Sequence, residues 1–111
     1  MKTLLLSFLF LTIAEASSLR PDRGLYVCNA GNEESICDQI LKPFFVGDKL
    51  TGISVEYVGW CGSMGPYTYA CENEVCEDAG LKFEFRDATH YRWENKQYGF
   101  FCEMGKKIIV R

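Results

Sequence analysis

Apolar and polar residues alternate over much of the chain, which is the pattern of β-strands that bury one face. In the first run, residues 24–28, Tyr26 and Cys28 are two positions apart and therefore point to the same face of a strand. In residues 81–86 every second side chain is apolar, starting from Leu81, and the residues between are charged. Alternation also predicts a strand at residues 52–58, and an aromatic run predicts another at 67–71. We interpret residues 90–93 and 97–104 as the arms of a hairpin and residues 106–111 as a short final strand.

One stretch, residues 33–41, has the spacing of a helix instead. Ile36 and Ile40 are four positions apart, so they would share one face of a helix, and a cysteine lies in the same apolar stripe. Asn32 is of a type that caps the start of helices, and a proline such as Pro43 ends them. One helix followed by antiparallel strands predicts an α+β fold, with the short helix packed on the sheet.

Residues 1–16 have the features of a secretory signal peptide. Lys2 supplies the positive charge, residues 4–13 form a short apolar core, and Ala14 and Ala16 are the small residues that a signal peptidase reads. A span across a bilayer needs about 20 apolar residues, so this core is too short. We predict cleavage after Ala16, export from the cell and no membrane span.

The rest of the chain has room for one domain. Residues 17–23 are polar, contain a proline and lack periodicity, which indicates a flexible leader. Residues 24–111 are then a single domain, whose small size limits its core and favours covalent stabilisation. We expect this domain to be a monomer.

All the cysteines follow the predicted signal peptide, and their number is six. An even number of cysteines in a small exported chain indicates disulfides, although the sequence leaves their pairing open. Zinc binding is the competing interpretation, but the chain has no Cys-x-x-Cys pair and a single histidine. The predicted disulfide cysteines are Cys28, Cys37, Cys61, Cys71, Cys76 and Cys102.

The net charge of −3 argues against general affinity for nucleic acids. Affinity for phosphate backbones comes largely from clustered lysine and arginine. The acidic stretch at residues 72–78 lacks the regular spacing of a calcium-binding loop, so we interpret it as a solvated loop. We predict neither a metal nor a cofactor.

The single histidine, His90, is the main candidate for acid–base chemistry. Glu84 and Arg86 share one face of the strand before it, and Glu56 lies on an earlier strand. A glutamate and a histidine could move protons at a phosphodiester while an arginine stabilises the phosphoryl charge. Each of these residues also suits the solvated face of a strand. The set therefore defines an alternative function, a secreted ribonuclease.

Aromatic residues make up 14% of the chain, and most of them must build the core of so small a domain. Those next to loops can instead anchor a protein partner, because tryptophan and tyrosine are enriched at interaction hot spots. Trp60 lies in a glycine-rich loop, and Trp93 and Tyr91 lie in a predicted hairpin. These three are the predicted binding residues.

Tyr26-Val27-Cys28, directly after the leader, resembles the Tyr-x-Cys motif of the ribonuclease-like effectors of powdery mildews. The wider organisation, a signal peptide before a small cysteine-rich and aromatic-rich domain, is similar to that of secreted effectors of plant-pathogenic fungi. The resemblance implies a helix on an antiparallel sheet, as in guanyl-specific fungal ribonucleases, and a disulfide between Cys28 and Cys102. Similarity to the effectors of blast fungi would instead imply a small β-sandwich, which is the alternative fold.

These features together predict a secreted virulence effector that binds a host protein or RNA without catalysis, with delivery into host cells as one route to its target. Two other functions stay open on the sequence alone. One is the secreted ribonuclease that uses His90, and the other is an inhibitor or toxin that works outside cells.

Overall fold

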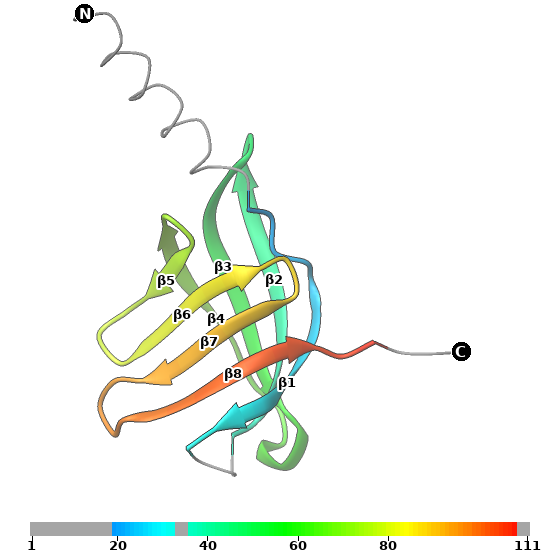
Figure 1. Ribbon diagram of the computed structural model, residues 1–111, viewed down its shortest axis with the longest axis vertical. Helices are drawn as coiled ribbons and strands as arrows, with labels where there is room; N and C mark the ends of the chain where they lie inside the picture. The colour runs from blue at the N-terminus through cyan, green and yellow to red at the C-terminus, as the bar shows by residue number, and fades with distance from the viewer. Residues whose placement is uncertain (1–18, 33–35, 109–111) are drawn as a thin grey trace, which may run out of the picture.

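Eight antiparallel strands close into a barrel in the computed structural model, which describes residues 19–32 and 36–108 (Figure 1). Each strand pairs with the next one along the chain, and β8 pairs with β1 to complete the ring. A short 3-10 helix, η1 (Gly59–Cys61), follows β3. The strands are β1 (Gly24–Gly31), β2 (Asp38–Val46), β3 (Lys49–Val58), β4 (Met64–Glu72), β5 (Val75–Glu77), β6 (Leu81–Asp87), β7 (His90–Asn95) and β8 (Phe100–Lys106).

The interior of the barrel is formed by apolar side chains from alternating positions. On β6, Phe83 and Phe85 are buried, whereas Glu84 between them is partly exposed on the outer face. On β3, Ile53 and Val55 are completely buried. The interior of an eight-stranded barrel is about wide enough for side chains to fill, and this one is filled mainly by aromatic and branched residues.

Most of the predicted strands are confirmed, with changed limits. The predictions at 52–58, 67–71 and 81–86 fall within β3, β4 and β6, and the predicted hairpin is formed by β7 and β8. The stretch predicted as an acidic loop contains the short strand β5. The final strand predicted at 106–111 is not formed at residues 107 and 108, and residues 109–111 lie outside the described part of the chain.

The predicted helix at residues 33–41 is wrong, because residues 38–46 form the strand β2; residues 33–35 lie outside the described ranges. Gln39 and Leu41 face the interior and Ile40 faces outward, as in a strand. So short a helix is marginal in water. In the barrel the same backbone pairs with β3 along the whole of β2 and with β1 at three positions. The predicted α+β class is therefore wrong, and the described fold is an all-β barrel.

The alternative fold, a β-sandwich, is also wrong, because a single sheet closes on itself. Pro43, expected to end a helix, lies within β2 instead. β1 pairs with β2 only at residues 39–41, so the side of Pro43 that faces away from β3 has no strand partner. Prolines are tolerated in strands at such unpaired positions. The helix-on-sheet fold that the ribonuclease-like resemblance implies is not the fold of this chain.

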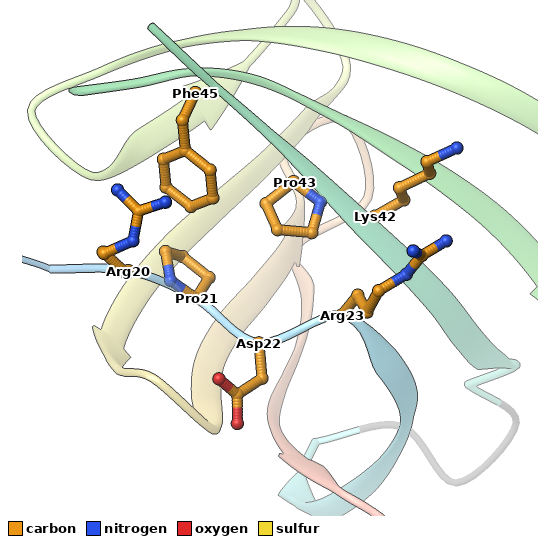
Figure 2. A pocket seen from close by; sticks show the side chains of 7 residues that line it. All are labelled: Arg20, Pro21, Asp22, Arg23, Lys42, Pro43 and Phe45. Carbon is orange, nitrogen blue, oxygen red and sulfur yellow. The ribbon is translucent and has the colours of Figure 1, made fainter. Parts of the chain in front are cut away.

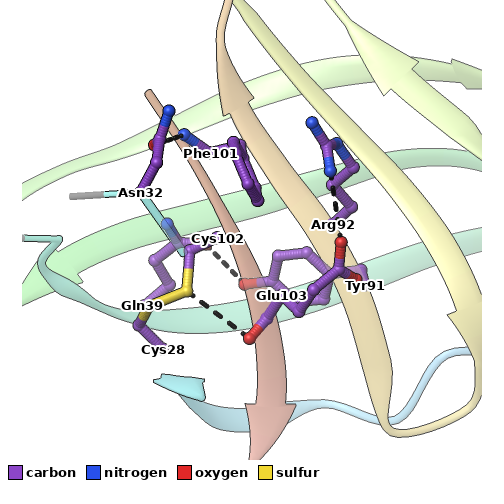
Figure 3. The surroundings of a disulfide bond; sticks show 8 residues. All are labelled: Cys28, Asn32, Gln39, Tyr91, Arg92, Phe101, Cys102 and Glu103. Atoms are coloured by element: carbon purple, nitrogen blue, oxygen red, sulfur yellow. Dashed lines mark hydrogen bonds and ion pairs between the residues drawn. A yellow bond between two sulfur atoms is a disulfide. The ribbon is translucent and has the colours of Figure 1, made fainter. Parts of the chain in front are cut away.

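Three disulfides use all six cysteines, which confirms the predicted disulfide framework. The first bridge joins β1 to β8, where the barrel closes, and is the pairing that the resemblance implies (Figure 3). The second ties the residue before β2 to η1, and the third links β4 to β5. The bridges are Cys28–Cys102, Cys37–Cys61 and Cys71–Cys76.

The segment before β1, residues 19–23, lies against the barrel. The Arg20 guanidinium is 3.9 Å from the centre of the Phe45 ring, and the backbone N–H of Asp22 donates to the Ala88 carbonyl at 2.8 Å. These contacts hold residues 19–23 against the wall of the barrel up to the start of β1. Within residues 19–32 and 36–108, no helix is long and apolar enough to cross a membrane.

Candidate binding site at the barrel mouth

One end of the barrel opens into an apolar cavity of about 280 Å³, and we call this end the mouth. The mouth lies where β2 begins, β3 ends and β8 begins. Its walls are mostly aromatic and aliphatic, as in many sites that bind small molecules. The lining residues are Ile36, Cys37, Gln39, Tyr57, Trp60, Trp93 and Phe100.

Trp60 stands at the rim of the mouth because a tight turn presents it there. The side chain is 72% exposed and belongs to η1. Gly59, the first residue of η1, and Gly62, the residue after it, have φ angles of 87° and 78°, which glycine adopts without steric cost. Cys61, next to Trp60, is bonded to Cys37 in the cavity wall. The disulfide therefore ties the turn that carries Trp60 to the mouth.

Phe100 is a second exposed aromatic residue of the rim. It begins β8, is 37% exposed, and its ring centre lies 6.1 Å from that of Tyr98, which is also exposed. Isolated exposed aromatic residues are normal on protein surfaces. Their grouping around an apolar cavity is not, and such surfaces mark interaction sites.

The inner wall of the mouth contains a polar side chain, Gln39, which is completely buried. Its Oε1 accepts a hydrogen bond from the Tyr91 hydroxyl (Figure 3). Its Nε2 has no hydrogen-bond partner among the described residues. Buried polar groups are nearly always paired, because an unpaired one costs free energy. The unpaired amide is therefore unusual for a side chain whose role is only structural.

Trp93 and Tyr57 complete the inner wall. Trp93 is 8% exposed, and its indole N–H is also without a hydrogen-bond partner in the described part of the chain. The Tyr57 and Tyr69 hydroxyl oxygens are 3.2 Å apart. Burial, and then the contact with Tyr69, raises the pKa of Tyr57; the nearby Trp93 indole opposes this without reaching hydrogen-bonding geometry. Tyr57 is thus a neutral wall residue at physiological pH.

Tyr91, the third predicted binding residue, lies inside the barrel and is 0% exposed. Its ring centre is 4.9 Å from that of Tyr26 and 5.1 Å from that of Phe85. Burial raises its pKa well above the usual value. Of the three predicted binding residues, the structure thus brings Trp60 and Trp93 together at the mouth. Tyr91 does not line the cavity, but its hydroxyl donates a hydrogen bond to Gln39, which does.

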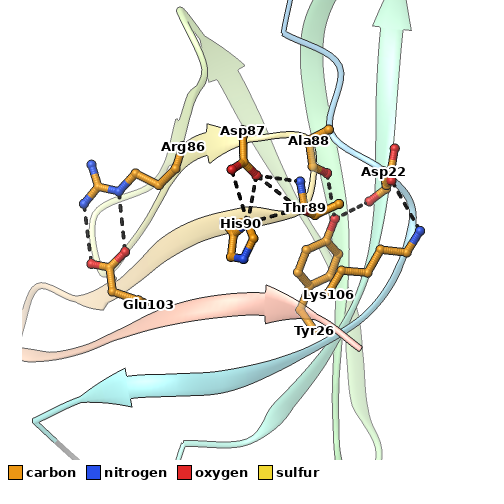
Figure 4. Close-up of polar contacts among 9 residues, drawn as sticks. All are labelled: Asp22, Tyr26, Arg86, Asp87, Ala88, Thr89, His90, Glu103 and Lys106. Atoms are coloured by element: carbon orange, nitrogen blue, oxygen red, sulfur yellow. Dashed lines mark hydrogen bonds and ion pairs between the residues drawn. The ribbon is translucent and has the colours of Figure 1, made fainter. Parts of the chain in front are cut away.

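His90 is the first residue of β7, directly after the turn from β6 (Figure 4). Its Nδ1 lies 2.9 Å from Asp87 Oδ1 and 3.0 Å from Thr89 Oγ1. Hydrogen bonds from the Thr89 backbone and then from His90 lower the pKa of Asp87. These contacts have the geometry of a local turn motif on an exposed surface.

Glu84 and Arg86, the other residues of the ribonuclease hypothesis, belong to ion pairs on the outer face of the barrel. Arg86 lies 3.8 Å from Glu84 and 3.4 Å from Glu103 on β8. Arg92 on β7 also lies 3.4 Å from Glu103. Such exposed pairs contribute about 0–1 kcal/mol of stability each. These ion pairs link β6, β7 and β8. A structural role therefore explains the positions of Glu84 and Arg86, and no catalytic role is needed to explain them.

Glu56 lies on β3 and accepts a hydrogen bond from Ser63. Among the described residues, no hydrogen bond or ion pair joins Glu56 or His90 to Glu84 or Arg86. The structure therefore does not assemble the four residues predicted for phosphodiester chemistry into one hydrogen-bonded site.

A second hollow, of about 330 Å³, lies beside the segment before β1 (Figure 2). Its charged side chains have both signs, and two of them are paired elsewhere: Arg20 with Asp48 at 3.5 Å, and Asp22 with Lys106 at 3.4 Å. In the described part of the chain, no group of three or more His, Cys, Asp or Glu side chains is placed to hold a metal ion. The mouth is the better candidate site.

Comparison with models of protein families, with curated proteins and with solved structures gives no match for this chain.

Sequence reasoning missed Gln39 and Phe100 as site residues. A helix over residues 33–41 would leave Gln39 out of its apolar stripe, so nothing in that pattern points to its burial. Only the correct strand assignment shows that Gln39 and Leu41 share the inner face. Phe100 was one aromatic residue among many, and its place at the mouth depends on how β8 meets β2 and β3 around the barrel.

Proposed function

We propose that this chain acts by binding, through the mouth of the barrel, and not by catalysis. The observation that carries the proposal is an exposed tryptophan, Trp60, held by a disulfide over an apolar cavity that is lined by the chain's other tryptophan, Trp93. Aromatic anchors beside apolar hollows dominate the binding energy of many interfaces.

The proposal includes export, which the disulfides support, because three bridges in so small a domain persist mainly in oxidising compartments. The fold is compatible with that location. We further propose the role predicted from the sequence, a secreted effector directed at a host molecule; its support is the signal-like N-terminus and the Tyr-x-Cys resemblance.

The binding proposal is tested with the folded, oxidised protein and N-phenyl-1-naphthylamine, an apolar probe whose fluorescence rises when it leaves water. We expect saturable binding to the unmodified protein. Trp60→Ala should weaken binding about tenfold or more, since a binding hot spot contributes about 2 kcal/mol. His90→Ala, which alters a side chain outside the mouth, is the matched control and should bind as the unmodified protein does.

Equal binding by the Trp60→Ala protein would contradict the proposed site. The same preparations should be incubated with RNA. Cleavage that disappears in the His90→Ala protein would contradict the absence of catalysis and restore the ribonuclease hypothesis.

A further inference from the structure

Aromatic side chains make up most of the wall of the mouth, and this is the observation from which the ligand can be characterised. Four of the seven described residues that line the cavity are aromatic, and the other three are uncharged. The face of an aromatic ring carries partial negative charge, so it attracts a cation as well as an apolar group. The four are Tyr57, Trp60, Trp93 and Phe100.

The four aromatic residues come from four different elements, β3, η1, β7 and β8, so they enclose the cavity from several sides. Tryptophan is the aromatic residue that attracts cations most strongly, and both tryptophans of the chain are among the four. Several aromatic side chains around one small cavity are the arrangement with which proteins recognise quaternary ammonium groups.

The acidic residues near the mouth add negative charge. Asp38, between two lining residues in the sequence, has its Oδ2 at 3.5 Å from the position of an added Cβ on Gly59, so it lies beside the turn that carries Trp60. Burial is the largest cause of the raised pKa of Tyr57, and the negative charge of Asp78 contributes to it. No ion pair within residues 19–32 and 36–108 includes either aspartate.

The wall also limits which kind of cation can bind. A primary ammonium has three N–H donors, and burying them against an apolar wall would leave them without acceptors. A quaternary ammonium has no N–H, so its methyl groups can contact the rings at no such cost. The one lysine of the β7–β8 turn beside the mouth, Lys96, is paired with Glu77 at 3.0 Å, so its charge is compensated.

We infer that the mouth binds a trimethylammonium group, enclosed by Tyr57, Trp60, Trp93 and Phe100. The inference rests on the proposed function and names the chemical class of ligand for that same site. The cavity of about 280 Å³ is slightly below the range of about 300–1,000 Å³ typical of drug-sized ligands, which suits a small head group.

The test compares choline with 3,3-dimethylbutan-1-ol, which has the same shape but a carbon atom in place of the charged nitrogen. Chemical shifts of the two indole N–H signals of the folded, oxidised protein measure both affinities. We expect choline to bind about tenfold more tightly, because only the cation is attracted by the rings. An apolar cavity without this attraction would prefer the neutral alcohol, since the alcohol loses less hydration on entering it.

Three variants assign the preference to particular side chains. Trp60→Leu keeps an apolar side chain at an exposed position and removes the ring, so it should reduce the preference for choline about threefold or more. Asp38→Asn should weaken choline binding about threefold and leave the alcohol unaffected. Asp48→Asn removes the same charge just past the other end of β2, and as the matched control it should change neither affinity.

A trimethylammonium group can belong to a free small molecule or to a lipid head group, and a second arm separates these sources. The protein is sedimented with vesicles of phosphatidylcholine and, separately, of phosphatidylglycerol. Binding to phosphatidylcholine vesicles alone, lost in Trp60→Leu, would identify the head group as a ligand. Choline binding without vesicle binding would identify a free small molecule.

The outcomes separate the two proposals. If the alcohol binds as tightly as choline, the inferred ligand class is wrong and the proposed binding site stands. If the preference for choline survives both Trp60→Leu and Asp38→Asn unchanged, the assignment of these side chains is wrong. If neither molecule binds while N-phenyl-1-naphthylamine does, the inference fails alone; if that probe does not bind either, the proposed function fails with it.

Discussion

At the scale of single residues, buried tyrosines are the most distinctive feature of the barrel. Four of the six tyrosines have a pKa above the usual value, in each case chiefly because burial disfavours the charged phenolate. Their hydroxyls are paired inside the protein, for example Tyr26 with the Asp22 and Ala88 carbonyls. The four are Tyr26, Tyr57, Tyr69 and Tyr91.

These tyrosines predict a loss of stability in alkali. In the unfolded chain they ionise near pH 10, whereas in the folded protein their pKa values are higher. The stability that they contribute is therefore complete below pH 10 and is lost as the pH rises above it. The fully buried Tyr91 alone accounts for about 1.4 kcal/mol per pH unit in that range.

Urea denaturation measures this loss at a series of pH values from about 8 to about 11.5, a range that brackets the ordinary tyrosine pKa of about 10. Tyr91→Phe removes one ionising group and should make the decline shallower. A free energy of unfolding that stays constant above pH 10 would contradict the buried state of these hydroxyls.

At the scale of elements, the contact between β1 and β8 determines whether the barrel closes. Gly31 of β1 lies opposite Cys102 of β8, past an irregularity in the register. An added Cβ at Gly31 would meet the Phe101 carbonyl oxygen and lie 3.0 Å from the Cys102 Cα. Both are backbone atoms, so they cannot rotate away as the end of a side chain can.

We therefore expect Gly31→Ala to destabilise the protein by about 1–3 kcal/mol, the usual cost of forcing extra atoms into a packed contact. Gly80→Ala is the matched control, because the nearest atom to its added Cβ is Asp78 Oδ1 at 3.9 Å. Thermal melting followed by circular dichroism compares the two. Equal melting temperatures would show that β1 does not approach β8 as closely as the structure has it.

The elements also show what can be predicted from this sequence and what cannot. Alternation identified β3 and β6, because each has one face in the core and one more exposed face. It failed at β2, where Ile36, Ile40 and a cysteine imitate a helical stripe although Ile40 is outside the barrel. The pairing of β2 with β1 and β3 decided that element, because whether a segment forms a strand depends strongly on such tertiary context.

The candidate site, like the fold, could be predicted from the sequence only in part. Trp60 could be found, since an exposed tryptophan in a glycine-rich loop is a local signal. The unpaired amide of Gln39 could not, because its burial follows from the correct assignment of β2 and from the Tyr91 side chain 52 residues away in sequence.

At the scale of the whole molecule, closure and function are linked through the disulfides. Cys28–Cys102 spans 74 residues and fastens the strands at which the ring closes. A bridge that closes so long a loop stabilises a small domain by about 2–5 kcal/mol. Cys37–Cys61 acts at the mouth, where it fixes the turn of Trp60. The disulfides thus fasten both the closure of the barrel and the turn at its mouth.

The central claim, that this opening is where the protein binds, is tested most directly by proton–nitrogen correlation spectra of the oxidised protein during titration with N-phenyl-1-naphthylamine. The chain has two tryptophans, so it gives two indole N–H signals, and both side chains line the mouth. We predict that both signals shift together and saturate, while the backbone signals of the β2–β3 hairpin around Gly47 stay in place. Shifts confined to that hairpin, or two indole signals that do not move at saturating probe, would contradict the claim.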